Sequence, residues 1–163
     1  MAERTSYALG TFSWIDLATT DPEPAKAFYA TLFGWSFDDR PVSQGVHYSM
    51  ALLDGAEVAA INPLPETMRA AGVPPAWMSY VTVADADAAA ALATELGGRV
   101  DNGPFDVLAA GRMAVLADAE GAVLSVWQAG DNVGARRVNE PGFVALHDPQ
   151  RAAFAVFEGS FDD

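Results

Sequence analysis

The feature that most constrains the fold is an internal repeat in which matched residues lie 64 positions apart. The matched pairs are Asp21 and Asp85, Ala25 and Ala89, Phe28 and Leu92, Leu32 and Leu96, and Gly34 and Gly98. Each copy places an acidic residue before an apolar stretch and a glycine after it. The repeat indicates a duplicated unit with the same order of elements in both halves.

The first copy begins with a predicted strand. From Phe12 to Leu17 the residues alternate, so that Ile15 and Leu17 share one face, while Phe12, Trp14 and Asp16 share the other. The first face is aliphatic and is expected to pack against a helix. The second face is mixed and is expected to point into a different environment.

A helix is predicted to follow this strand. Asp21 is suited to cap it with its side chain, Pro22 fits the first helical position, and Gly34 supplies a left-handed stop. The apolar residues that recur at three- and four-residue spacing are Ala25, Phe28, Tyr29, Leu32 and Phe33. In the second copy Asp85 is the cap, and Leu92 and Leu96 form the corresponding stripe.

Three further strands are predicted in each half, and the last two are joined by a tight turn. The turns are Asp54-Gly55, a dipeptide favoured in hairpins, and Asp118 to Gly121. The predicted strands of the first half cover 36–39, 47–53 and 57–61, and the second half has a strand over 77–83, a helix over 85–96, and strands near 99–102, 112–117 and 123–128. The result is an α+β chain with two β-α-β-β-β modules.

The predicted organisation has a central pair of modules with flanking segments. The modules cover residues 10–62 and 76–130, and a linker of residues 63–75 joins them. Residues 1–9 form an N-terminal tail, and residues 131–163 form a C-terminal extension. In the extension Asp148-Pro149 resembles Asp21-Pro22, and Ser160 to Asp163 repeats Ser36 to Asp39. We therefore interpret it as the remnant of a further module with a shortened helix, and give His147 little weight as a functional residue.

Composition excludes several classes of function. The chain has 163 residues, 51% of them hydrophobic, which predicts one soluble domain that buries about 70% of its unfolded surface. The absence of cysteine excludes disulfides and thiolate metal sites. A net charge of −13 argues against nucleic acid or an anionic membrane as partner. The N-terminus does not resemble a signal peptide, so we expect a cytoplasmic protein.

The duplicated module resembles the vicinal oxygen chelate superfamily, which includes glyoxalase, extradiol dioxygenases and bleomycin-resistance proteins. The similarity covers about 10–130 and is closest to an actinobacterial glyoxalase-like branch. It rests on Trp14 to Leu17, Ala25 to Tyr29, Leu32 to Trp35, Pro104 to Val107, Gly111 to Val115, Asp118 to Gly121 and Trp127-Gln128. The resemblance implies that the modules form a curved mixed sheet around a cup, and that two copies form a homodimer.

Metal-using members of the superfamily place their ligands on the first, fourth, fifth and eighth strands. By this resemblance the matched positions are Trp14, Met78, Ser125 and, less certainly, Ile61. None has a side chain suited to a divalent catalytic ion, which needs about three His or carboxylate donors. The two histidines, His47 and His147, match none of these positions. We expect no metal and no other cofactor.

The matched positions predict a site for a small aromatic molecule. Strand parity places aromatic, thioether and hydroxyl groups in the cup, which suits a flat ligand stacked on rings. The residues predicted to bind it are Phe12, Trp14, Met78, Tyr80, Phe105, Arg112, Ser125 and Trp127. In the alternative interpretation these aromatic residues fill the cup as core, and Arg112 makes a salt bridge instead of holding an oxyanion.

Asp16 is the predicted catalytic residue. Beside Phe12 and Trp14 it would lose solvent, which raises the pKa of a carboxyl group and favours general acid or base chemistry. It could instead be a structural carboxylate. His47 is the second candidate if it faces the cup, but the opposite parity would turn Tyr48 and Met50 inward.

Two functions follow from this site. The first is a metal-independent enzyme that performs dehydration, cyclisation or ketal formation on an aromatic polyketide-like natural product. The alternative is a non-catalytic protein that sequesters an aromatic antibiotic, as bleomycin-resistance relatives do. The buried acid favours the enzyme, while the acidic surface would suit binding of a cationic drug.

Overall fold

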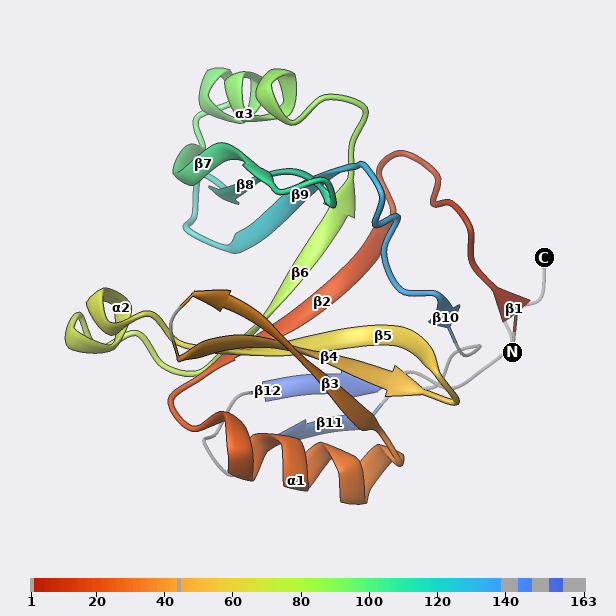
Figure 1. Cartoon of the computed structure of the whole chain (residues 1–163). Coiled ribbons are helices and arrows are strands. Elements are labelled where there is room, and N and C mark those ends of the chain that lie inside the picture. Colours follow the sequence, from red (N-terminus) through yellow and green to blue (C-terminus); the bar gives the residue numbers. More distant parts are fainter. Residues whose placement is uncertain (1, 44, 139–143, 148–152, 157–163) are drawn as a thin grey trace. The chain divides into compact units, whose positions relative to one another are not determined.

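The computed structural model describes residues 2–43, 45–138, 144–147 and 153–156. The chain divides into two compact units (Figure 1). The first unit consists of Met1–Arg4, Ile15–Trp77 and Ala135–Asp163, and the second of Thr5–Trp14 and Met78–Gly134. Each unit contains one β-α-β-β-β module, except that the residues up to Trp14 at the start of the first module belong to the second unit, and Ala76 and Trp77 at the start of the second module belong to the first unit. The predicted α+β class and the two modules are confirmed.

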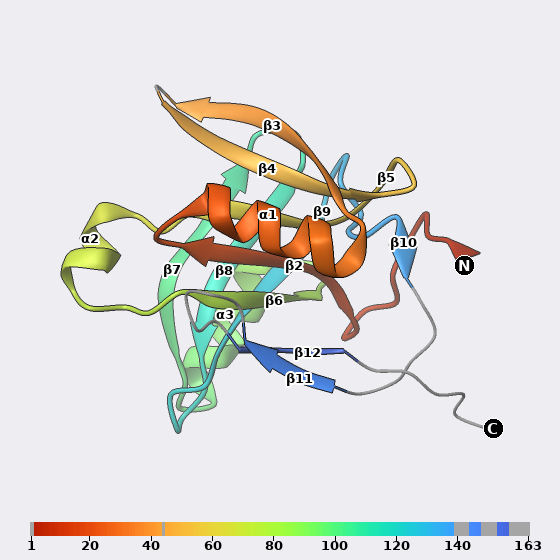
Figure 2. The same ribbon diagram turned by 90° about the horizontal axis from the view of Figure 1, so that it is seen from below.

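The first unit is built on four strands and one long helix. Its elements are β2 (Phe12–Thr19), α1 (Pro22–Phe33), β3 (Ser36–Ser43), β4 (Val46–Leu53) and β5 (Ala56–Pro63). The strands lie in the order β3-β4-β5-β2, with β2 and β5 parallel and the other pairs antiparallel. Helix α1 covers one face of this sheet (Figure 2).

Helix α1 begins and ends where the sequence predicts. Asp21 precedes it in an extended conformation, and Gly34 ends it with a φ of 71°, donating its N–H to the Ala30 carbonyl oxygen at 2.9 Å. The side chain of Asp21 makes no capping hydrogen bond, contrary to expectation. Asp85 does cap the second helix, because its Oδ1 accepts from Ala88 N at 2.9 Å.

The core of the first unit lies between α1 and the sheet. Leu17 and Ile61 from the strands meet Tyr29 from the helix, and all three are fully buried. The indole nitrogen of Trp77 donates to Tyr29 Oη at 3.0 Å, so the buried phenol is satisfied. Partly buried aromatic residues surround this cluster: Phe28, Phe33, Trp35, Phe37 and Trp77.

Shorter elements flank these strands. The predicted linker contains the short helix α2 (Glu66–Ala70). At the N-terminus β1 (Ala2–Glu3) pairs with β10 (Arg137–Val138) in an antiparallel bridge. In the C-terminal extension β11 (Val144–His147) pairs with β12 (Ala153–Val156).

The extension differs from the expected module remnant. Ala153–Val156 is a strand, where the similarity of Asp148-Pro149 to Asp21-Pro22 suggested a shortened helix. Pairing with Val144–His147 supplies this strand with backbone hydrogen bonds that a short helix would have to form alone. The predicted repeat of Ser36 to Asp39 at Ser160 to Asp163 lies outside the described residues.

The second unit repeats the plan. Its elements are β6 (Ala76–Thr82), α3 (Ala86–Glu95), β7 (Arg99–Val107), β8 (Gly111–Ala117) and β9 (Val123–Ala129). They lie in the order β6-β9-β8-β7, with β6 and β9 parallel. Within the described residues, no helix is both long and apolar enough to cross a membrane.

Helix α3 packs through small residues, not through the predicted leucine stripe. Ala86 and Ala90 are buried against Ala114 and Val126, whereas Leu92 is 53% exposed. Leu96, just after the helix, is 75% exposed. The alanine positions allow a close approach to the sheet, and Leu92 then lies about 200° around the helix from Ala90. The repeat therefore conserves the helix but not its buried face.

This packing predicts effects of very different size for two substitutions in α3. Ala90→Leu should lower the free energy of unfolding by about 1–3 kcal/mol, because the added methylenes have no space against the sheet. Leu92→Ala should change it by less than about 0.5 kcal/mol, because the side chain is exposed. Urea unfolding of both variants checks this. A large loss for Leu92→Ala would contradict the observed helix orientation.

Candidate functional site

The first unit brings Asp16 and Tyr48 together on the face of its sheet opposite α1. The Tyr48 hydroxyl donates to Asp16 Oδ2 at 3.0 Å. Asp16 is only 6% exposed, while Tyr48 is half-buried. The burial expected for Asp16 is therefore present, and its carboxylate is held by a phenol from a strand 32 residues further along.

Strand register explains this arrangement. Asp16 lies beside Ala60 of β5, and Ala60 lies beside Met50 of β4. Leu17 and Ile61, one residue further along their strands, point to α1, so Asp16 and Ala60 must point away from it. The small Ala60 side chain leaves room for the Tyr48 side chain to reach across β5.

A second polar group lies on the same face. Arg40 of β3 is directly opposite Tyr48 in the antiparallel pair. Its guanidinium contacts Glu57 Oε1 at 2.7 Å and Asp38 Oδ2 at 3.0 Å. The hydrogen bond to Glu57, followed by that to Asp38, outweighs burial and raises the pKa of Arg40. The face therefore carries a phenol, a buried carboxylate and a guanidinium that is already paired.

His47 does not join Asp16. It is exposed and alternates with Tyr48, so it lies on the α1 side of the sheet with Ser49. On that side Ser49 Oγ donates to Asp39 Oδ1 at 2.5 Å, and Lys26 Nζ pairs with Asp39 Oδ2 at 3.0 Å. The hydrogen bond from Ser49, then that from Lys26, lowers the pKa of Asp39.

Strand β4 is therefore oriented so that Tyr48 and Met50 point to the same face as Asp16, while His47 points to the opposite face. The predicted His47–Asp16 pair does not form in the structure. Tyr48 takes the place that was expected for His47, and Arg40, the register partner of Tyr48, is a residue of this face that the sequence did not single out. Tyr48 could have been predicted from the alternation of side chains along β4, but only if the register of β4 with the strands of Leu17 and Ile61 were known.

In the second unit several predicted residues share the face opposite α3. Register places Tyr80 beside Ser125, Thr82 beside Trp127, and Trp127 beside Met113. Phe105 is the register partner of Met113. Met78 is two residues before Tyr80 in β6, so both side chains point to the same face. On β2, Trp14 is buried, whereas Phe12 is 64% exposed.

These aromatic residues already have partners. Tyr80 and Trp127 meet edge to face with ring centroids 6.3 Å apart, and Trp127 Nε1 donates to the Asn132 carbonyl oxygen at 2.9 Å. Among the described residues, the buried hydroxyls of Thr82 and Ser125 have no hydrogen-bond partner. The rings pack as the core-filling alternative expects, while the two hydroxyls leave hydrogen-bonding capacity unused.

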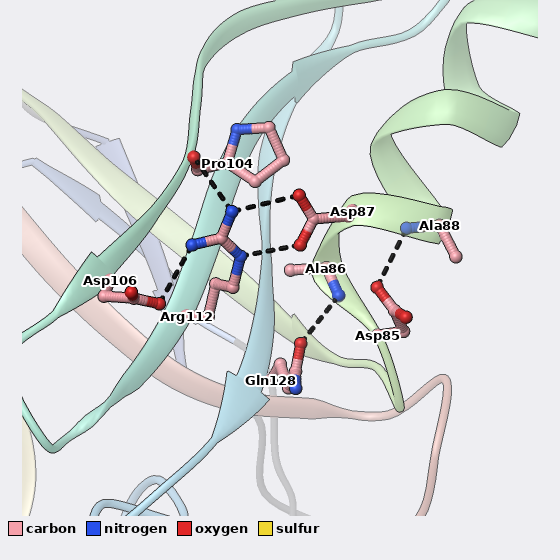
Figure 3. Close-up of polar contacts among 8 residues, drawn as sticks. All are labelled: Asp85, Ala86, Asp87, Ala88, Pro104, Asp106, Arg112 and Gln128. Carbon is pink, nitrogen blue, oxygen red and sulfur yellow. Dashed lines mark hydrogen bonds and ion pairs between the residues drawn. The ribbon is translucent and has the colours of Figure 1, made fainter.

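Arg112 faces α3 instead of the predicted binding face. Its guanidinium contacts Asp87 Oδ2 at 2.6 Å and Asp106 Oδ1 at 2.9 Å, and Nη2 also reaches the Pro104 carbonyl oxygen at 3.4 Å (Figure 3). The hydrogen bond to Asp87, then that to Asp106, raises the pKa of Arg112. Arg112 and Ala114 are two residues apart in β8, so their side chains point to the same face, and Ala114 packs on α3. The salt-bridge alternative is the one observed.

A second contact fixes the start of α3 beside this ion pair. The Gln128 side-chain oxygen accepts from Ala86 N at 3.0 Å, while Asp85 caps Ala88 (Figure 3). Gln128 lies beside Arg112 in the β8–β9 pair. Both side chains therefore hold the first turn of α3 to the sheet, and their role in the structure is to position the helix.

The residues at the family's ligand positions do not fit a divalent metal ion. Trp14, Met78 and Ser125 offer an indole, a thioether and a hydroxyl, and Ile61 packs on Tyr29. Ala60 is the β5 residue on the Asp16 face, and it has no donor either. In the part of the chain that the structure describes, no three His, Asp or Glu residues are grouped to hold an ion.

A family model for the glyoxalase/bleomycin resistance protein/dioxygenase superfamily matches residues 11–126. This range covers the first module and the second module up to the middle of β9. The chain therefore belongs to that superfamily.

Two relatives show longer chains. CFP32 of Mycobacterium tuberculosis, named as a glyoxylase, is 44% identical over 163 residues, which is 97% of this chain and 62% of CFP32. The anthracycline biosynthesis protein DnrV of Streptomyces peucetius is 35% identical over 150 residues, covering 86% of this chain and 54% of DnrV. The chain thus spans little more than half the length of these curated relatives.

Solved structures confirm the fold. A methylmalonyl-CoA epimerase of Streptomyces coelicolor, solved with 2-nitronate-propionyl-CoA, superimposes with a TM-score of 0.56 at 18% identity. The match covers 77% of this chain and 98% of the epimerase. A methylmalonyl-CoA epimerase from Mycobacterium tuberculosis has a TM-score of 0.53 at 20% identity, covering 78% and 92%. At this identity the likeness concerns the fold alone.

The Arg112 cluster gives a pH-dependent prediction. The hydrogen bond from Arg112 lowers the pKa of Asp87 below its ordinary value of 3.8. A lowered carboxyl pKa stabilises the fold above the unfolded-state value and loses this effect as pH falls through the folded-state value. Asp87→Asn should therefore be less stable than the parent protein at pH 7, and the difference should shrink below about pH 3.8.

Urea unfolding midpoints between pH 7 and pH 3 measure this difference. Asp131→Asn is a matched control, because Asp131 is exposed and makes no ion pair among the described residues. Equal midpoints for Asp87→Asn and the parent protein at pH 7 would show that the ion pair does not stabilise α3.

Proposed function

We infer that this chain performs general acid–base chemistry on an aromatic polyketide-like molecule, with Asp16 as the proton-transferring group. The observation that carries the proposal is the hydrogen bond of 3.0 Å from Tyr48 to the buried Asp16 carboxylate. Burying a charged group is costly, and such groups are common where a carboxylate must exchange protons.

Similarity to DnrV supports the class of substrate. That protein is named for anthracycline biosynthesis, and anthracyclines are fused aromatic polyketides. Their precursors carry carbonyl groups beside acidic C–H bonds, and their assembly includes loss of water. A single carboxylate can serve both steps of such a dehydration. The reaction needs no redox cofactor.

The proposed proton transfers balance within one carboxyl group. Asp16 removes a proton from a carbon next to a carbonyl, and the C–H electron pair forms the new double bond. Asp16, now protonated, returns the proton to the departing hydroxyl group, which leaves as water. Tyr48 keeps the carboxylate in one orientation by donating its O–H to Oδ2. It is therefore a positioning residue.

A second candidate function is sequestration of a cationic aromatic antibiotic. The observation that favours it is the net charge of −13, which attracts cations over a long range. In this case Asp16 would anchor the ligand, and no product would form. The two functions differ in what the loss of the Asp16 charge does to binding and to turnover.

Turnover and binding of anthracyclinone precursors test the enzyme proposal. Asp16→Asn should lower kcat by about 10²–10⁴-fold while leaving the Kd within a few fold, because a general acid–base group acts on the barrier. Tyr48→Phe should lower kcat by about tenfold, which corresponds to one hydrogen bond to a charged group. Product formation by chromatography and binding by fluorescence provide the two readouts.

His47→Gln is the informative comparison. Because His47 is exposed on the α1 side, this variant should keep the parent kcat. A large loss would restore His47 as a catalytic candidate. If Asp16→Asn keeps its turnover while its affinity falls, Asp16 is a ligand anchor and the acid–base proposal is wrong.

A further inference from the structure

A polar cavity of about 640 Å³, partly open to solvent, lies in the first unit, where Glu57, the partner of Arg40, lines it but Asp16 and Tyr48 do not. Its walls come from the β4–β5 turn, the start of β5, the N-terminal strand β1 and the residues at the beginning of β10. The lining includes Glu3, Asp54, Gly55, Glu57, Arg136 and Arg137. No function described so far involves this cavity.

Backbone hydrogen bonds fix the walls. Arg136 N donates to the Glu57 carbonyl oxygen at 2.6 Å, and Arg4 N donates to the Arg136 carbonyl oxygen at 2.8 Å. Glu3 is the register partner of Arg137 in the β1–β10 bridge. Three segments that are far apart in the sequence are therefore tied into one site by their main chains.

Two of the cavity's carboxylates are already neutralised. Arg137 Nη1 contacts Asp54 Oδ2 at 2.7 Å, and Arg40 Nη2 contacts Glu57 Oε1 at 2.7 Å. Among the residues that the structure describes, Glu3 and Arg136 make no ion pair. Within the described part of the chain, Glu3 and Arg136 are thus the carboxylate and the guanidinium of this cavity that have no ion-pair partner.

This charge pattern selects against singly charged ligands. An anion attracted by Arg136 would also meet three carboxylates, and a cation attracted by Glu3 would also meet two guanidinium groups. A molecule with both charges can pair with each free group and avoid both repulsions. The cavity volume falls within the range of small-molecule sites, about 300–1,000 Å³.

We propose that this cavity binds a small zwitterion, with its carboxylate at Arg136 and its ammonium at Glu3. The chemical class is a free amino acid or a related aminocarboxylate. Arg136 can hold a carboxylate through two parallel hydrogen bonds, which fixes that end of the ligand. The spacing between the two charges then decides which member of the class fits.

A series of aminocarboxylates with increasing charge separation tests the proposal. The probes are glycine, β-alanine, 4-aminobutyrate and 6-aminohexanoate, with carboxylates and alkylamines of equal length as singly charged analogues. The amide NMR signals of Gly55 and Ala56, which line the cavity, report binding. One chain length should bind at least about fivefold more tightly than its singly charged analogues, as expected for one exposed ion pair.

Two substitutions test which residue binds each charged end of the ligand. Arg136→Gln and Glu3→Gln should each weaken binding of the best zwitterion about fivefold, and the first should not weaken binding of alkylamines, because it removes a charge that repels them. Arg69→Gln is the matched control, because Arg69 pairs with Glu66 on α2 and does not line the cavity. Circular dichroism of each variant verifies folding.

Three outcomes would overturn the proposal. These are the absence of shifts at Gly55 and Ala56 with every probe, equal affinity for the zwitterions and their singly charged analogues, and equal effects of Arg69→Gln and Arg136→Gln. None of them bears on Asp16, so the acid–base proposal is tested separately.

Discussion

Alternation along the strands is the constraint on which both units depend. In each unit one helix covers one face of a four-stranded sheet, and alternate residues of the strands supply the apolar side chains that pack against it. The intervening side chains must then point to the opposite face. This is why Leu17 and Asp16, which are neighbours in the chain, have such different surroundings.

The pair of Asp16 and Tyr48 shows how this constraint can place a polar group in a buried position. Asp16 cannot turn toward α1 without placing its carboxylate among Leu17, Ile61 and Tyr29. On its own face it receives a hydrogen bond from Tyr48, so part of the cost of burial is offset. In the second unit Arg112 lies on the helix side, where Asp87 and Asp106 surround it.

The sequence predicted the modules well because their signals are local. Gly34 ends α1 and Asp54-Gly55 forms the hairpin turn as expected, since each conformation depends on a few neighbouring residues. Site residues were predicted less well. The directions in which His47 and Tyr48 point depend on which face of β4 meets α1. The direction in which Arg112 points depends on which face of β8 meets α3. Neither is encoded within its own strand.

The sequence by itself determined the duplicated β-α-β-β-β plan, because hydrophobic periodicity and turn residues act over short distances. It also indicated that Asp16 and Leu17 belong to opposite faces. Only the tertiary structure decided that Tyr48 reaches Asp16, and that the main chain of Arg136 bonds to Glu57 and Arg4 beside the hairpin. These contacts join residues far apart in the chain, and they depend on strand register and on packing between elements.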